Sequence, residues 1–160
     1  MKETVTIGVY GYTAESFVAA LRGADVRLLL DVRQRRGVRG REFSWANSLR
    51  LQGALDEAGM AYRHHRELAP TTELRQRQYR EDDRLGVGKR SRVALAPEYV
   101  ERYTSEILDC VDLGPVIEGM PAEGSSALLC VERDPEACHR MLIAARLATE
   151  HDVCVRHLRP

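Results

Sequence analysis

The sequence predicts an α/β fold: a single domain, residues 1–160, with a mainly parallel sheet of about five strands and helices on both faces. Short apolar runs with the length of buried strands alternate with longer segments whose apolar residues recur at helical spacing. Residues 5–32 read as strand, helix and strand, which is the pattern of a βαβ unit. These two observations favour parallel strands joined by helical crossovers.

The first half of the chain contains three predicted strands and two predicted helices. The strands are expected at residues 5–9, 26–32 and 61–65. Thr13 is a suitable N-cap for a helix through about residue 22, which Gly23 would end. Ser44 is expected to cap a second helix over residues 45–58, with Gly59 after its end.

The second half begins with a very polar segment, residues 71–92, which we interpret as an insertion or a lid. Its G-V-G-K stretch at residues 86–89 lacks the first Gly and the final Ser or Thr of a phosphate-binding P-loop, so we do not interpret it as one. Pro97 opens a predicted helix to about residue 110. A loop is expected at residues 114–126, and strands at 127–131 and 152–158.

Reactive side chains concentrate after the apolar run at residues 127–131. The sequence from 127 to 140 is A-L-L-C-V-E-R-D-P-E-A-C-H-R. Asp134 followed by Pro135 indicates the start of a helix. Because ligands bind at the carboxyl ends of parallel strands, the turn between this strand and this helix is a candidate site. We expect the strands at 26–32 and 127–132 to be central neighbours, with their carboxyl ends at one edge of the sheet.

A second candidate segment follows the strand at residues 26–32. Five of the nine residues from 33 to 41 are Arg, and two are Gly. Arginine side chains bind phosphate and carboxylate through paired hydrogen bonds. The loop should leave the sheet at the same edge as the 127–140 turn, so we expect it to help hold an anionic ligand.

Composition narrows the class of protein. Lys+Arg and Asp+Glu number 24 each, and this balance argues against a general nucleic-acid coat protein. The four cysteines lack the spacing of a disulfide framework, which predicts free thiols in a cytoplasmic protein. The N-terminal residues lack the apolar segment of a signal peptide, and no stretch is apolar enough to span a bilayer.

Several motifs, in order along nearly the whole chain, resemble the family called domain of unknown function 488. They are Thr6-Ile7-Gly8, Asp31-Val32-Arg33, Phe43-Ser44 after an Arg-bearing loop, Gly59-x-x-Tyr62-x-His64-x-x-Glu67-Leu68, and Cys130-x-Glu132-x-Asp134-Pro135-x-x-Cys138-His139-Arg140. The resemblance implies an α/β fold and a site at the matching residues, but no established reaction. The chain departs from the family pattern at Val9-Tyr10-Gly11, where a His is frequent, and at Ala69, where a Gly is usual.

The leading hypothesis is an anion- or phosphate-binding site, in an enzyme that acts on a nucleotide-like or phosphorylated substrate. Glu132 and His139 are the candidate catalytic residues, for proton transfer. The candidate ligand-binding residues are Arg33, Arg39, His64 and Arg140. Asp31, Cys130 and Cys138 are expected around them, with Asp31 orienting an Arg. We expect Arg33 and Arg140 to be exposed enough that their loss leaves folding largely intact.

Three alternatives stay open. A non-catalytic module could bind nucleic acid or a modified nucleotide through the basic loop and the polar segment. Rhodanese-like thiol chemistry at Cys130 is a second, although acidic neighbours would raise the thiol pKa. A metal site of Cys130, Glu132, Cys138 and His139 is disfavoured, because adjacent residues 138 and 139 would point about 100° apart on a helix. No cofactor, metal or membrane partner is therefore expected.

Overall fold

The computed structural model describes residues 1–160 and contains one sheet of five parallel strands in the order β3-β2-β4-β1-β5. The strands are β1 (Glu3–Ile7), β2 (Val26–Asp31), β3 (Ala61–His64), β4 (Ser125–Leu129) and β5 (Cys154–His157). This confirms the predicted α/β class. It also confirms that the strands predicted at 26–32 and 127–132 are parallel central neighbours, since β2 pairs with β4.

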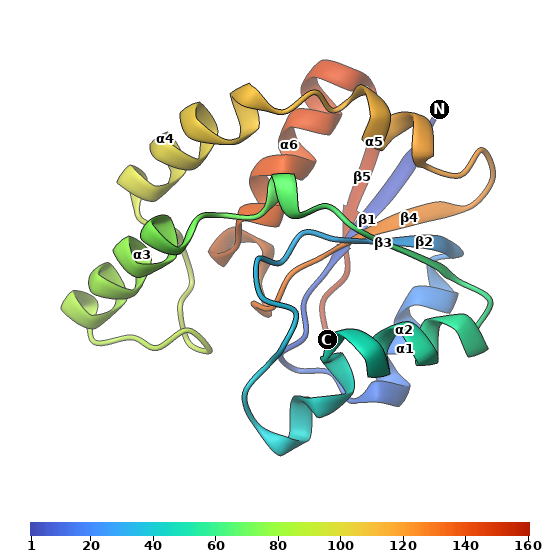
Figure 1. Ribbon diagram of the computed structural model, residues 1–160, viewed down its shortest axis with the longest axis horizontal. Coiled ribbons are helices and arrows are strands. Elements are labelled where there is room, and N and C mark those ends of the chain that lie inside the picture. Colours follow the sequence, from blue (N-terminus) through green and yellow to red (C-terminus); the bar gives the residue numbers. More distant parts are fainter.

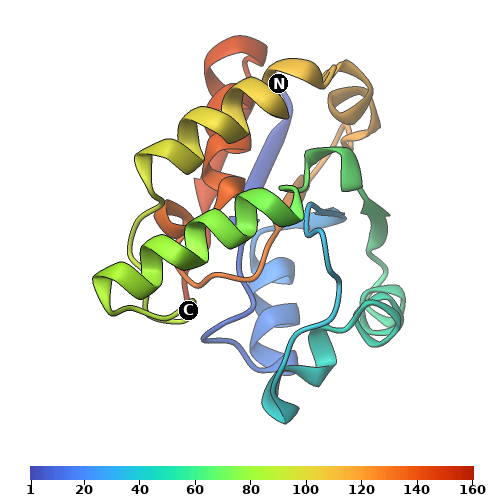
Figure 2. The same cartoon turned by 60° about the vertical axis from the view of Figure 1, so that its left-hand side comes forward.

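Helices cover both faces of the sheet (Figure 1). α1 (Ala14–Gly23) and α2 (Ser48–Glu57) lie on one side, and α5 (Gly114–Gly119) and α6 (His139–His151) lie on the other. α4 (Pro97–Glu106) and α3 (Thr72–Leu85) run side by side beyond α6, as Figure 2 shows. None of the helices combines the length and the apolar composition that a bilayer-spanning segment needs.

The core is built on the central strands. β4 is buried along its whole length, as expected for a parallel strand covered on both faces. Phe17 and Leu21 of α1 pack against one face, and Ile143, Ala144 and Leu147 of α6 belong to the same apolar cluster. These side chains recur at helical spacing. Each helix therefore buries one apolar face against the sheet and leaves its opposite face in solvent.

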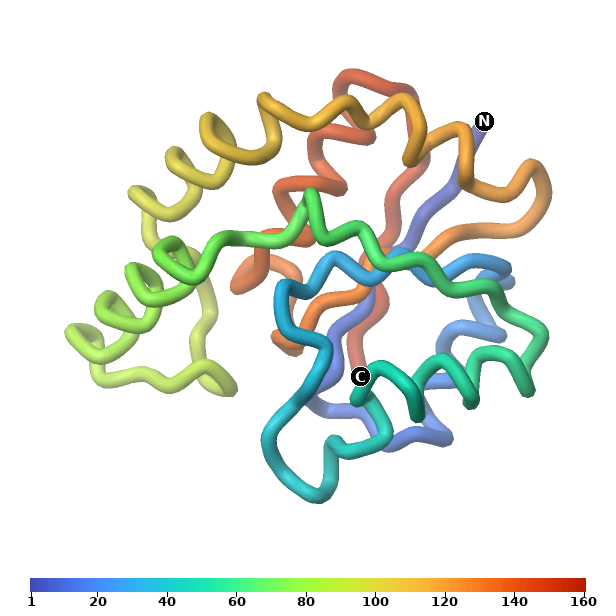
Figure 3. Tube along the Cα trace, viewed as in Figure 1, coloured from blue at the N-terminus to red at the C-terminus, as the bar shows by residue number.

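The order of the strands reverses around β4. The connections after β1 and β2 lead toward β3 at one edge, whereas the connection after β4 leads through α6 to β5 at the opposite edge. A crevice is expected at the carboxyl ends of the strands where such a reversal occurs. Figure 3 shows the long path from β3 through α3 and α4 back to β4, which passes beside this position.

Apart from the end of α4, which lies at Glu106 rather than near residue 110, three predicted element boundaries are wrong. Residues 41–46 form a 3₁₀ helix that contains Ser44, so α2 begins at Ser48 rather than at residue 45 and Ser44 is not its cap. The stretch at 114–126 is not simply a loop, because α5 begins at Gly114 with Pro115 in its first turn. Pro is favoured at that position because it lacks the N–H that would be left without a partner.

The third correction concerns the turn after β4. Pro135–Ala137 form a short 3₁₀ turn, and α6 begins only at His139. Cys138 is the extended N-cap residue of α6, with φ −142° and ψ 145°, not a residue one turn inside the helix. Its side chain therefore leaves the backbone in a direction that helical geometry would not give.

The polar segment 71–92 forms α3 and the loop after it. Thr71 caps the helix by accepting a hydrogen bond from the amide of Leu74 at 3.2 Å, and Gly86 ends it at φ 71°. Leu74, Gln78 and Asp82 make up the buried face of this helix. The segment is polar because most of its remaining residues are in solvent.

Gly8, directly after β1, lies against the backbone of the turn that follows β4. A Cβ atom at this position would be 1.9 Å from the carbonyl oxygen of Glu132. The amides of Val9 and Tyr10 both donate to the carbonyl of Val131, at 3.0 and 3.1 Å. Only a residue without a side chain allows the two backbone segments to approach this closely.

We predict that Gly8→Ala lowers the free energy of unfolding by about 1–3 kcal/mol or more, because the methyl group meets backbone that cannot move aside. Gly53 is the matched control: it lies in the interior of α2 with nothing within 4 Å of its added Cβ. Gly53→Ala should raise stability by about 0.5–1 kcal/mol. Urea denaturation measures the free energy of unfolding of both variants. A Gly8→Ala variant that is as stable as the wild type would show that the close approach at Gly8 is not needed.

Candidate functional site

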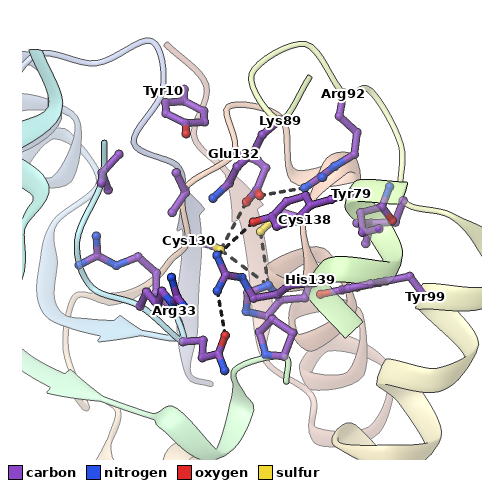
Figure 4. Close-up of a pocket in the computed structure, with 18 of the residues that line it drawn as sticks. Tyr10, Arg33, Tyr79, Lys89, Arg92, Tyr99, Cys130, Glu132, Cys138 and His139 are labelled. Atoms are coloured by element: carbon purple, nitrogen blue, oxygen red, sulfur yellow. Dashed lines mark hydrogen bonds and ion pairs between the residues drawn. The ribbon is translucent and has the colours of Figure 1, made fainter. Parts of the chain in front are cut away.

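A cavity of about 440 Å³ lies at the carboxyl ends of β1, β2 and β4. Its floor consists of residues that follow β4 and begin α6, namely Cys130, Glu132, Cys138 and His139. One wall is the basic loop after β2, and the other is α3 with the loop that follows it. Figure 4 shows side chains from all three segments directed into the same space.

The structure brings together six of the nine residues that the sequence singled out. Those lining the cavity are Arg33, Arg39, Cys130, Glu132, Cys138 and His139. Asp31, His64 and Arg140 do not line it. Nε2 of His64 forms a hydrogen bond with the carbonyl of Arg33 at 2.8 Å. His64 therefore supports the start of the basic loop from outside the cavity.

Arg33 is held by a paired hydrogen bond to Asp31. Its Nε donates to Oδ1 at 2.9 Å and its Nη2 donates to Oδ2 at 2.8 Å, while Nη1 donates to the carbonyl of Ala46 at 2.8 Å. The hydroxyl of Tyr62 adds a 2.6 Å bond to Asp31 Oδ2. Both charged side chains are at most 1% exposed. The expectation that Arg33 is exposed is therefore wrong, and its removal would leave a buried carboxylate unpaired.

Arg140 is fully buried rather than turned to the rim of the site. Its Nη1 donates to the carbonyl of Glu132 at 2.6 Å, and its Nη2 donates to the carbonyl of Arg133 at 3.1 Å. The guanidinium thus fastens the start of α6 to the end of β4. Its role is to fix the turn that carries the floor of the cavity, which corrects the expectation that it is a ligand contact.

Glu132 is part of a buried network of charges. Arg92 donates from Nη2 to Glu132 Oε1 at 2.8 Å and from Nη1 to Asp82 Oδ2 at 2.7 Å. Gln78 donates to the other oxygen of Asp82 at 2.9 Å. Burial raises the pKa of Glu132 above its usual value, and the nearby positive charges of Lys89 and Arg92 oppose that shift.

The two buried thiols converge on the ring of His139. Nδ1 of His139 is 3.6 Å from Sγ of Cys130 and 3.7 Å from Sγ of Cys138. The other ring nitrogen, Nε2, is 2.9 Å from the carbonyl oxygen of Val32. A carbonyl only accepts, so Nε2 carries a proton, and in neutral His139 the lone pair of Nδ1 faces both sulfur atoms.

The two thiols differ in acidity. Burial raises the pKa of Cys130 well above its usual value, which disfavours the proposed rhodanese-like nucleophile at this residue. Burial acts on Cys138 too, but the hydrogen bond from Cys130 and the positive charges of His139 and Arg140 hold the pKa of Cys138 well below its usual value. Burial also lowers the pKa of His139. The neighbouring Cys138 acts in the opposite direction, and on balance the pKa of His139 is raised above its usual value.

Several residues of the site were missed by the sequence analysis. They are Tyr10, Arg75, Gln78, Tyr79, Lys89, Arg92 and Tyr99. The basic residues of the polar segment and its G-V-G-K stretch were the available signal, although that stretch is no P-loop. Lys89 reaches the cavity from a loop, not from the N-terminus of a helix. All four cysteines are free, and Cys110 and Cys154 are exposed.

Two Asp–Arg pairs have the same spacing in the sequence but differ in burial. The pair Asp31 and Arg33 is buried, and the pair Asp25 and Arg27 is exposed. We predict that Arg33→Ala lowers the free energy of unfolding by about 3–5 kcal/mol, because Asp31 is left buried without its partner. Arg27→Ala, which removes the exposed partner of Asp25, should cost only about 0–1 kcal/mol. Denaturant unfolding of both variants measures this, and a cost below 1 kcal/mol for Arg33→Ala would contradict it.

Comparison with known proteins gives one positive finding. The family described as "Domain of unknown function DUF488" matches residues 13–147. Searches of curated proteins and of solved structures gave no match. The matched range includes β2, β4, the start of α6 and every candidate site residue named from the sequence. Because the match spans most of the 160 residues, this chain belongs to the DUF488 family.

Proposed function

We propose that the cavity binds a small anionic molecule, such as a nucleotide-like or phosphorylated substrate, and presents it to Glu132. The observation that carries this proposal is the charge of the lining. Six basic side chains face one acidic side chain, Glu132. The basic residues are Arg33, Arg35, Arg39, Arg75, Lys89 and Arg92.

The six basic residues fall into two groups. Arg33 and Arg92 are neutralised by buried carboxylates, so their charge is already balanced within the protein. Arg35, Arg39, Arg75 and Lys89 form no ion pair with a carboxylate. Four cations at one concave site favour an anion of more than one charge, and Arg and Lys are the usual ligands of phosphate.

Size and shape favour a small ligand over a polymer. The volume of the cavity lies within the range of about 300–1,000 Å³ typical of small-molecule sites. Tyr10, Tyr79 and Tyr99 supply aromatic surface beside the cations, which suits a ligand with a planar ring. A nucleic acid would enter the cavity only through a single nucleotide or a chain end. A nucleic-acid-binding module is therefore the second candidate function.

Glu132 is placed to exchange a proton with a bound ligand. Arg92 donates to its Oε1, whereas Oε2 accepts only a long hydrogen bond from the thiol of Cys130, at 3.4 Å. A carboxylate fixed by one oxygen keeps the other available for general acid–base work. The polar segment 71–92 then acts as a wall that closes over the ligand, since Arg75, Tyr79 and Lys89 come from it.

We predict that pyrophosphate and nucleoside phosphates raise the melting temperature, and that Arg39→Ala and Lys89→Ala each weaken this binding by about 1–3 kcal/mol through loss of a charge-assisted hydrogen bond. Arg22→Ala is the matched control, because Arg22 is exposed at the end of α1, outside the cavity, and its loss changes the net charge equally. Thermal shift titrations measure all three.

Equal weakening in the Arg22→Ala control would show that the effect is general electrostatics and would contradict a site in the cavity. Titration with a short single-stranded oligonucleotide separates the two candidate functions. Affinity for the oligonucleotide that exceeds affinity for single nucleotides, and that falls steeply with salt, would favour the nucleic-acid module.

A further inference from the structure

We infer that Cys130, Cys138 and His139 bind a zinc-class transition-metal ion through their two Sγ atoms and Nδ1, with a fourth coordination position open to the cavity. The inference is independent of the anion proposal, because it rests on the floor of the cavity alone. The three ligand atoms lie within 4.8 Å of one another, and all three residues are buried. Figure 4 shows the thiols and the imidazole directed toward one another.

The two nitrogen–sulfur distances match a tetrahedral metal centre. With zinc–sulfur bonds of about 2.3 Å and zinc–nitrogen bonds of about 2.05 Å, a tetrahedral angle places nitrogen and sulfur about 3.6 Å apart. The separations from Nδ1 of His139 are 3.6 Å to Cys130 and 3.7 Å to Cys138. Both nitrogen–sulfur separations therefore already match the ion. The two sulfur atoms lie within 4.8 Å of each other, and in a tetrahedral centre they would sit about 3.8 Å apart.

The imidazole is oriented as in known metal sites. Histidine ligands commonly donate their second ring nitrogen to a carbonyl or carboxylate, which fixes the tautomer and directs the lone pair at the metal. Here Nε2 of His139 donates to the carbonyl of Val32 at 2.9 Å. Tyr103 packs on the ring at 5.5 Å between centroids, and its hydroxyl is anchored on the carbonyl of Leu68 at 2.6 Å.

Local backbone structure removes the objection raised from the sequence. Residues 138 and 139 would diverge if both were helical, but Cys138 is extended and only His139 is in α6. The thiol of Cys138 can therefore face the same point as the imidazole. Cys130 directly follows β4, so the site joins the end of the strand to the helix that follows it.

Charge balance and ligand type indicate which ion fits. On binding, the two thiols lose their protons, and two thiolates with one divalent cation make a neutral centre that tolerates burial. Thiolate and imidazole ligands suit zinc and related soft or borderline ions rather than magnesium or calcium. Three protein ligands with an open fourth position are typical of catalytic zinc, and Glu132 Oε2, 3.4 Å from Cys130 Sγ, lies beside that position.

The test uses the double variant Cys110→Ser/Cys154→Ser, which removes both exposed thiols and leaves Cys130 and Cys138 as the only sulfur nucleophiles. The protein is reduced, its two remaining thiols are counted, and Co²⁺ is added without oxygen. We expect uptake of about one ion per chain, with thiolate-to-cobalt charge-transfer bands and the intense visible bands of a tetrahedral site. Zn²⁺ should displace the cobalt, and the bands should then disappear.

Adding Cys138→Ser to this background should weaken Co²⁺ binding at least about tenfold and reduce the charge-transfer absorption. If that variant does not fold, the spectrum of the double variant still decides, because its thiolate bands can come only from Cys130 and Cys138. Reduced double variant that takes up no Co²⁺, or that binds it without charge-transfer bands, overturns the inference. Metal uptake without pyrophosphate binding would leave the inference standing and reject only the anion proposal.

Discussion

The carbonyl oxygen of Glu132 is the point at which the first strand, the fourth strand and the last helix are tied together. Gly8 after β1 lies against it, and Nη1 of Arg140 in α6 donates to it at 2.6 Å. A buried guanidinium is costly to leave unpaired, so the hydrogen bond strongly restricts how α6 can sit on the end of β4. The positions of Cys130, Cys138 and His139 follow from that restriction, because they flank the fixed peptide on both sides.

The charges of the site divide into those that build it and those available to a ligand. Arg33 and Arg140 are at most 1% exposed. Arg33 is paired with Asp31, whereas Arg140 donates from both Nη atoms to backbone carbonyls and its Nε has no partner. Arg39 and Lys89 line the same cavity and form no ion pair with a carboxylate. Removing one partner of a buried ion pair lowers the stability of the fold strongly. Removing a cation that has no carboxylate partner changes stability little. Substitutions in the two groups should therefore separate folding from binding.

Much of the fold follows from local sequence patterns. The apolar runs at 26–32 and 127–131 gave the central strands, and parallel strands put their carboxyl ends at one edge of the sheet. The patterns do not show which remote segment covers that edge, so Lys89 and Arg92 could not be assigned to the site. Local sequence patterns also place the start of α6 wrongly. Asp134-Pro135 favours a helix start, but the chain forms a 3₁₀ turn there and Cys138 is the N-cap residue of α6. That single extended residue decides whether the thiol and the imidazole can meet.

The ends of β2 and β4 meet at one cavity, with a sulfur–imidazole cluster on its floor and cations without carboxylate partners on its walls. A crystal structure of the reduced protein grown with ZnCl₂ and pyrophosphate, with anomalous data at the zinc edge, tests this most directly. The account predicts an anomalous peak between Cys130, Cys138 and Nδ1 of His139, and pyrophosphate density beside Arg39 and Lys89 in the same cavity. A zinc peak only at the exposed Cys110 or Cys154, with pyrophosphate outside the cavity, would contradict it.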